Sequence, residues 1–123
     1  MSDWWQWSPI KANQKLGFAV VGIGRFGSAV CRELLRNGAD VLAVDFSEKA
    51  IEELRQLEPT IEARVVDSTD EESMKEAGVL EMGTVVVGIS EPIEASITTT
   101  LIAKDTEGSL VKQVIARATS DLH

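Results

Sequence analysis

A glycine-rich segment directly after an apolar run constrains this chain more than any other feature of its sequence. Residues 18–21 (FAVV) are continuously apolar, as in a strand buried on both faces, and they lead into G-x-G-x-x-G at residues 22–27. In that position Gly22 permits a tight turn, Gly24 lets backbone approach a pyrophosphate, and Gly27 lets the next helix lie close to the strand. The segment predicts a strand, a loop, and a helix whose amino end can bind an anion.

Apolar runs alternate with helical patterns along the rest of the chain. Residues 41–44 and 85–87 have the character of buried strands, whereas residues 61–65 and 111–117 are more polar and predict strands at the sheet edges. Helical patterns separate these strands, at residues 27–37, 48–57, 69–77 and after residue 92. Because parallel crossovers are right-handed, we predict an α/β domain, a Rossmann-like doubly wound parallel sheet in the order 3-2-1-4-5, with its sixth strand missing or incomplete.

Two of the predicted helices carry signals at their ends. Thr69 and Glu72 have the spacing of a capping box, so we expect a short helix that starts at Thr69 and stops at Gly78. The last helix is expected to carry Pro92 in its first turn. Its buried face is predicted from the spacing i, i+4, i+7 and i+8, which selects Ile93, Ile97, Thr100 and Leu101.

Composition fits one globular domain at residues 16–123, preceded by an extended leader at residues 1–15. The 123 residues are 44% hydrophobic and 26% charged, which is typical of a soluble globular domain. The leader holds Trp4, Trp5 and Trp7. Either these side chains pack on a partner or a neighbouring subunit, or the leader is disordered; the sequence leaves both possibilities open.

Charge and residue counts exclude several functions. Twenty acidic against twelve basic residues give a net charge of −8, which repels nucleic acid, so no such partner is expected. A single cysteine excludes an intrachain disulfide, and no stretch reaches the roughly 20 apolar residues of a membrane span. The cytosol therefore fits best. Tyrosine is absent and His123 is the only histidine, so Tyr-Lys and most Ser-His or Cys-His catalytic groups are impossible and no enzyme is expected.

An acidic residue closes the second apolar run. Asp45 lies 23 positions after Gly22, close to the spacing of about 20 at which an acid binds the ribose hydroxyls of a nucleotide. Its charge repels a 2′-phosphate, and the next residue is Phe46 rather than a base, so NADP is disfavoured. The alternative is that Asp45 only caps the next helix.

Further candidates lie in the loop and after the third and fourth apolar runs. Asp67 and Ser68 can meet an adenine edge, or they form only a helix-entry turn. Gly88 and Ser90 are small enough to leave room for a ligand. The variable loop positions are Ile23, Arg25 and Phe26; Arg25 is expected to project toward a phosphate tail, the alternative being a solvent-facing side chain.

Together these segments resemble a known family over residues 18–117. GIGRFG, VLAVD, VVDSTD, VVVGIS and the helix start Ile93-Glu94-Ala95-Ser96 resemble the KTN or RCK (TrkA-N) nucleotide-binding domain of Trk/Ktr-type potassium uptake regulators. The resemblance implies a regulatory subunit at the inner face of the cell membrane that binds ATP, ADP or NAD(H). It also implies homodimers, a higher ring in the full-length form, and a membrane potassium-translocating subunit as partner.

The resemblance also assigns roles to individual residues. Gly22, Gly24 and Gly27 are implied to hold phosphates, Asp45 the ribose and Asp67 the adenine side, while Arg25 is implied to sense the phosphate tail. The chain stops before the segments that follow the fifth strand in this family, so we expect a truncated chain or one that needs a partner segment. The alternative function is the dinucleotide-binding half of an NAD-dependent oxidoreductase.

Overall fold

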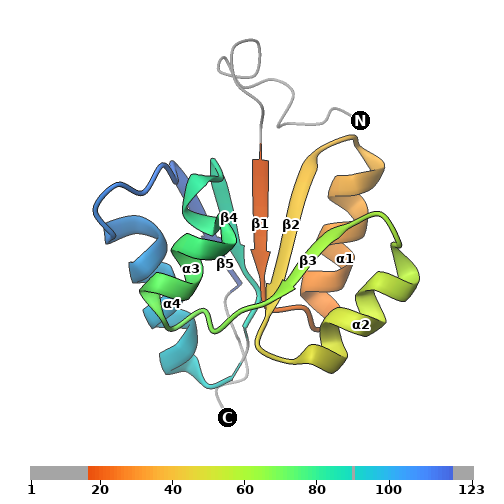
Figure 1. Ribbon diagram of the computed structural model, residues 1–123, viewed down its shortest axis with the longest axis horizontal. Coiled ribbons are helices and arrows are strands. Elements are labelled where there is room, and N and C mark those ends of the chain that lie inside the picture. Colours follow the sequence, from red (N-terminus) through yellow and green to blue (C-terminus); the bar gives the residue numbers. More distant parts are fainter. Residues whose placement is uncertain (1–16, 90, 118–123) are drawn as a thin grey trace.

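Five parallel strands form one sheet in the order β3-β2-β1-β4-β5 (Figure 1). The computed structural model describes residues 17–89 and 91–117. The strands are β1 (Gly17–Val21), β2 (Asp40–Asp45), β3 (Glu62–Val65), β4 (Thr84–Val87) and β5 (Gln113–Ala116). The predicted fold class and strand order are confirmed. Trp4, Trp5 and Trp7 lie outside the described residues.

Helices cover both faces of the sheet (Figure 1). α1 (Arg25–Arg36) and α2 (Glu48–Leu57) cover one face, and α3 (Glu71–Ala77), the short 3-10 helix η2 (Val79–Glu81) and α4 (Ile93–Asp105) cover the other. Successive strand residues point to opposite faces, so Phe18 and Val20 pack in the layer of α1 and α2. Ala19 and Val21 pack in the other layer. The continuously apolar strand thus supplies both cores.

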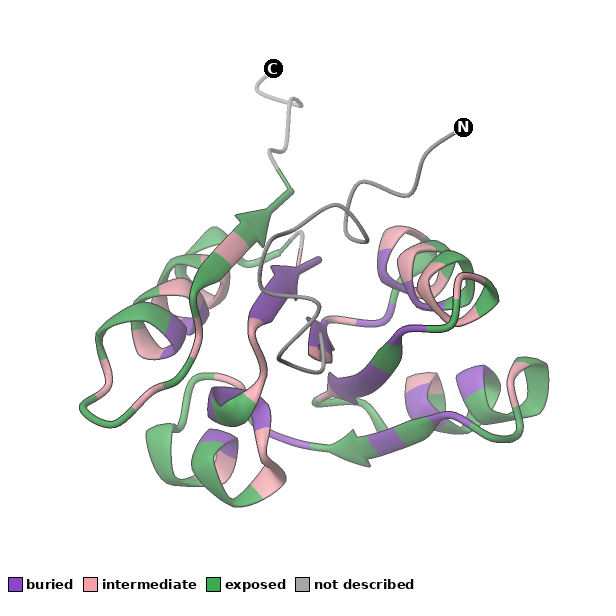
Figure 2. Ribbon diagram, turned by 90° about the horizontal axis from the view of Figure 1, so that it is seen from above, coloured by how far each residue is buried: buried purple, intermediate pink, exposed green. Residues whose placement is uncertain are grey.

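Burial falls from the centre of the sheet to its edges (Figure 2). β1 and β4 are buried almost throughout, whereas three of the four residues of β3 and of β5 are exposed. The two more polar strands therefore lie at the edges, as predicted. None of the helices in the described part combines the length and apolar character that a membrane span requires.

The start of α3 differs from the prediction. Asp70 is its N-cap and accepts a hydrogen bond from the Ser73 N–H at 3.0 Å, so the predicted capping box of Thr69 and Glu72 is wrong. The physical reason is that Thr69 belongs to the turn of Asp67, whose Oδ1 accepts both the Thr69 hydroxyl and the Thr69 N–H, while the Asp70 carboxylate reaches the first turn of α3 and accepts from the N–H and the hydroxyl of Ser73. The predicted stop is confirmed, since Gly78 is left-handed with φ 89°.

The buried face of α4 also differs. Pro92 is the N-cap rather than a first-turn residue, and Thr99 and Ala103 are the buried positions. Ile93, Ile97 and Leu101 are 57%, 54% and 53% exposed. Small side chains let α4 approach the sheet closely, so packing selected the face with Thr99 and Ala103 over the face with the larger side chains.

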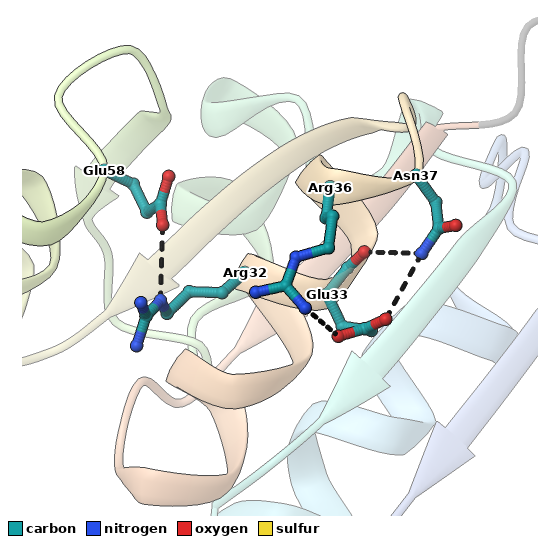
Figure 3. A network of polar contacts seen from close by, with 5 residues as sticks. All are labelled: Arg32, Glu33, Arg36, Asn37 and Glu58. Carbon is teal, nitrogen blue, oxygen red and sulfur yellow. Dashed lines mark hydrogen bonds and ion pairs between the residues drawn. The ribbon is translucent and has the colours of Figure 1, made fainter.

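A polar network ties α1 to the chain around it (Figure 3). Arg32 Nε donates to Glu58 at the end of α2 at 3.2 Å, and Asn37 Nδ2 donates to the Glu33 carbonyl at 2.8 Å. Arg36 pairs with Glu33 at 3.4 Å. α1 itself begins at Arg25, two residues before the predicted start. The network secures the carboxyl-terminal half of α1 and leaves its amino end free of these contacts.

Candidate functional site

An open cavity of about 540 Å³ lies at the carboxyl edge of the sheet. The register explains why: Val21 lies opposite Val44 and Val87, so the next residues Gly22, Asp45 and Gly88 share one row. Eight of the twelve predicted site residues line the cavity, namely Gly22, Ile23, Gly24, Asp45, Phe46, Asp67, Ser68 and Gly88. Residues from four different strand ends are thereby brought to one place.

Backbone hydrogen bonds hold these strand ends together. Gly22 N–H donates to the Val44 carbonyl at 2.9 Å, and Gly88 N–H donates to the Val21 carbonyl at 2.7 Å. Val66 N–H donates to the Asp45 carbonyl at 2.9 Å. The parallel ladders thus continue one step past the strands, which gives the cavity a rigid floor.

The three loop glycines occupy different surroundings. Gly22 has φ +96°, a left-handed conformation that favours glycine. A Cβ on Gly27 would collide with the Gly22 carbonyl oxygen, so α1 can lie close to β1 only with glycine there. A Cβ on Gly24 would meet no protein atom within 4 Å. Gly24 is exposed and lines the cavity, so a ligand there can approach its backbone.

The amino end of α1 adds positive potential beside the loop. Its N-cap is Gly24, no side chain caps it, and its first turn holds no acidic residue. Unpaired N–H groups and the helix dipole there favour an anion. Because Gly24 also lines the cavity, part of the cavity lies at this helix end, which favours an anion.

Asp45 links the loop to the start of α2. Its Oδ2 accepts the Ile23 N–H at 2.6 Å and its Oδ1 accepts the Ser47 N–H at 2.7 Å. The N-cap of α2 is Ser47, whose hydroxyl accepts the Ala50 N–H at 3.1 Å, so Asp45 is not itself the cap. A carboxylate has about four acceptor positions, and two remain for ligand hydroxyls. Phe46 beside it is 77% exposed.

Asp67 forms a helix-entry turn and lines the cavity as well. Its Oδ1 accepts the Thr69 hydroxyl at 2.6 Å and the Thr69 N–H at 3.0 Å. These two bonds, the hydroxyl first, lower the pKa of Asp67, so the carboxylate is charged at neutral pH. Ser68 Oγ lies 2.7 Å from Thr99 Oγ1, and Thr99 is fully buried. That hydrogen bond joins this turn to α4.

Three of the predicted residues that the structure describes are not among those that line the cavity. Arg25 is exposed, and Gly27 is a buried residue of α1. Phe26 packs beside Gly88, because a Cβ added to Gly88 would lie 3.3 Å from Phe26 Cδ2. Ser90 lies outside the described residues. The predicted site residues did not include Ile89, Pro92 and Ala95, which also line the cavity. Ala95 belongs to the helix start that carries the family resemblance, and that motif is the signal that could have placed it in the site.

A doubly wound parallel sheet with a G-x-G-x-x-G loop between β1 and α1, and an acid at the end of β2, defines the Rossmann-like class of nucleotide-binding domains. Residues 18–123 match the family model described as the TrkA-N domain. The chain belongs to the TrkA-N domain family, which confirms the resemblance of its motifs.

Relatives and solved structures agree with this assignment. Ktr system potassium uptake protein C of Bacillus subtilis (strain 168) is 38% identical over 109 residues, 89% of this chain and 47% of that protein. The NAD(P)-binding domain of an exopolyphosphatase-related protein from Archaeoglobus fulgidus is 26% identical with a TM-score of 0.68, covering 85% of this chain and 74% of that one. The TrkA-N domain of ybaL from Escherichia coli shares the fold, with a TM-score of 0.72. It is 24% identical, and the match covers 89% of this chain and 77% of that one.

The matched region is only part of the potassium uptake protein. The chain spans about half the length of that relative. The activity, substrates and partners of a whole protein of that kind are therefore matters for proposal.

Proposed function

We propose that this domain binds an adenine nucleotide, either ATP or ADP or NAD(H), at the carboxyl edge of its sheet, and that occupancy of this site regulates potassium uptake. One observation carries the proposal. The Ile23 N–H of the glycine loop donates to Asp45 Oδ2 at 2.6 Å, so the loop suited to phosphates and the acid suited to ribose form one connected unit.

Each part of the nucleotide has a matching group. The glycine loop and the amino end of α1 receive the phosphates, with Arg25 near the phosphate tail. Asp45 accepts hydrogen bonds from the ribose hydroxyls and disfavours a 2′-phosphate by its charge. Asp67, Ser68 and the exposed ring of Phe46 border the base, and Gly88 leaves space for the remainder of the ligand.

The proposed role is regulatory rather than catalytic. The relative from Bacillus subtilis is named a potassium uptake protein, and we infer that this chain acts on a membrane potassium-translocating subunit from the cytoplasmic face. Homodimers, and a ring in the full-length form, are the proposed assembly. Shifting such an assembly from 1:99 to 99:1 requires about 5.5 kcal/mol of differential binding. One hydrogen bond supplies less than this, so either several subunits or a whole γ-phosphate must contribute.

Calorimetry on the purified chain tests the binding step. We expect ATP, ADP or NADH to bind, and Asp45→Asn to weaken the affinity by about tenfold or more, because charged hydrogen bonds contribute about 1.5–3 kcal/mol each. Asp105→Asn, which removes an exposed carboxylate at the end of α4, is the matched control and should bind as the parent does.

Two outcomes would contradict the proposal: no measurable nucleotide binding by the parent chain, or unchanged affinity in Asp45→Asn. Mass spectrometry of small molecules that copurify with the chain would identify which nucleotide it prefers. Hydride transfer by the full-length protein would instead favour the oxidoreductase alternative.

A further inference from the structure

A second cavity, of about 480 Å³, lies at the amino edge of the sheet, opposite the edge of the proposed nucleotide site. Its apolar lining comes from both core layers. Leu35 and Ile61 belong to the layer of α1 and α2, and Ala77 and Met82 belong to the layer of α3 and α4. Leu35, Ala77 and Met82 are only half-buried. Both hydrophobic cores therefore present apolar side chains at this cavity, which an apolar segment would cover.

The start of β1 lies at this amino-edge cavity. Gly17 pairs with Asp40, which lines the cavity. A Cβ on Gly17 would lie 2.7 Å from Met82 Sδ, and Met82 lines the cavity too. β1 is the central strand of the sheet (Figure 1). The leader, residues 1–15, precedes Gly17 by a single residue, so the chain connects it to the domain beside this cavity.

The leader has side chains that suit the amino-edge cavity. Trp4, Trp5 and Trp7 each combine a large apolar body with a polar N–H, which fits a site that is apolar inside and polar at its rim. Trp7 lies ten positions before Gly17, and an extended chain of ten residues spans at most about 33–36 Å. The tryptophans can therefore turn back and reach the cavity.

The amino-edge cavity and the leader differ in the sign of their charge. Asp40 and Glu62 line the cavity, and its lining residues in the described part include no lysine or arginine. The leader carries Lys11 and Lys15 against one acidic residue, Asp3. Opposite charges favour the approach of the leader to this edge. Because exposed ion pairs contribute little, burial of the indole rings must supply most of the binding free energy.

We propose that the amino-edge cavity is the docking site for the leader of the same chain, with tryptophan side chains packed on Leu35, Ala77 and Met82. The leader is favoured over a segment of another molecule because its covalent connection at Gly17 gives it a high effective concentration at the cavity. Docking would cover the half-buried apolar side chains at the amino ends of the strands. The proposal concerns the edge opposite the nucleotide site and does not depend on the proposed function.

The tryptophans themselves report on docking. The chain has no other tryptophan and no tyrosine, so the tryptophan fluorescence of the full chain comes from the leader alone. We expect the native chain to emit at shorter wavelength than the chain unfolded in urea, and acrylamide to quench it less. Native emission and quenching equal to those of the unfolded chain would overturn the proposal.

A nitroxide label locates the docked leader. Thr60 is exposed and lines the amino-edge cavity, and Cys31 is fully buried, so the label on native Thr60→Cys attaches at position 60. We expect this label to remove most of the tryptophan emission, and unfolding in urea to restore it. Glu48→Cys is the matched control, because Glu48 is exposed at the start of α2, near the carboxyl edge. Its label should leave most of the emission.

Mixing distinguishes docking within one chain from docking on a second copy. A labelled Thr60→Cys chain that also carries Trp4→Phe, Trp5→Phe and Trp7→Phe is mixed with the unlabelled parent. Unchanged parent emission supports the proposal, whereas quenched emission would assign the leader to a neighbouring copy and contradict it. Equal quenching by the labels at positions 60 and 48, or a shift in emission only after anionic lipid vesicles are added, would also contradict docking at this cavity.

Discussion

Gly24 and Gly27 belong to the same six-residue loop, but we expect glycine to be needed at Gly27 for packing and at Gly24 for ligand binding. Gly27→Ala would bring a Cβ against the Gly22 carbonyl oxygen, and such overpacking costs about 1–3 kcal/mol of folding stability. Gly24→Ala meets no protein atom, and its φ of −92° suits alanine, so the loss should stay below about 1 kcal/mol, the cost of a poorer N-cap.

For nucleotide affinity we expect Gly24→Ala to be the more damaging of the two substitutions, although it is the milder one for stability. Gly24→Ala fills the space where backbone and phosphate would meet, so we expect binding to fall by more than tenfold, since a single charge-assisted hydrogen bond contributes about 1.5–3 kcal/mol. Urea unfolding and calorimetry on both variants measure the two effects. A Gly24→Ala chain that binds normally would mean that phosphate does not approach this backbone.

Single residues also show where sequence reasoning reached its limit. Asp45 was predictable because the spacing from Gly22 is a property of one β-α-β unit. Pro92 was not, because α4 reaches the cavity only through the crossing of a later unit. Arg117 likewise becomes a neighbour of Phe26 only when β5 pairs with β4. Long-range pairing of this kind leaves no local pattern.

At the level of elements, one buried hydroxyl joins α4 to the turn between β3 and α3. Thr99 is fully buried, and its hydroxyl contacts Ser68 Oγ at 2.7 Å and the Ser68 carbonyl at 3.2 Å. Thr99→Val keeps the shape and removes the donor. We expect a loss of about 0.5–1.5 kcal/mol in unfolding free energy, since the half-buried polar groups of Ser68 lose a hydrogen-bond partner.

Thr99→Ser is the control, because it restores the hydroxyl while deleting one methyl group. It should retain more of the unfolding free energy than Thr99→Val in urea titrations. Equal stability of the parent and Thr99→Val would show that water replaces the bond and that α4 does not depend on Ser68.

The strands were predicted correctly because apolar content alone distinguishes central from edge strands. The buried face of α4 was predicted wrongly because large apolar residues and small residues lie on different faces of this helix. The strand types and order followed from apolar content, since central strands need apolar residues on both faces. In α4 the large residues Ile93, Ile97 and Leu101 repeat with helical period, yet Thr99 and Ala103 are the residues buried against the sheet. Helical periodicity predicts that apolar residues share one face of the helix. Which face is buried depends on how closely the helix can approach the sheet.

For the whole molecule, Cys31 couples folding to pH. It is a fully buried residue of α1, and burial, together with the negative charge of Glu58, raises the pKa of its thiol from 9.0 to about 12. The folded chain therefore keeps a proton that the unfolded chain loses between about pH 9 and 12. Because the folded chain holds this proton more tightly, the contribution of Cys31 to the unfolding free energy is complete below pH 9. It is lost as the pH rises from 9 to 12, and the unfolding free energy falls by no more than about 1.4 kcal/mol per pH unit.

Comparing the parent with Cys31→Ala isolates this effect from all other titrating groups. The alanine variant should be less stable at pH 8 because a cavity replaces the sulfur. We expect the difference between the two unfolding free energies to narrow from pH 9 to 10.5 in urea titrations, because only the parent releases a thiol proton on unfolding. Parallel curves over this range would mean that the thiol ionises equally in both states, and hence that α1 does not shield it from water in the folded chain.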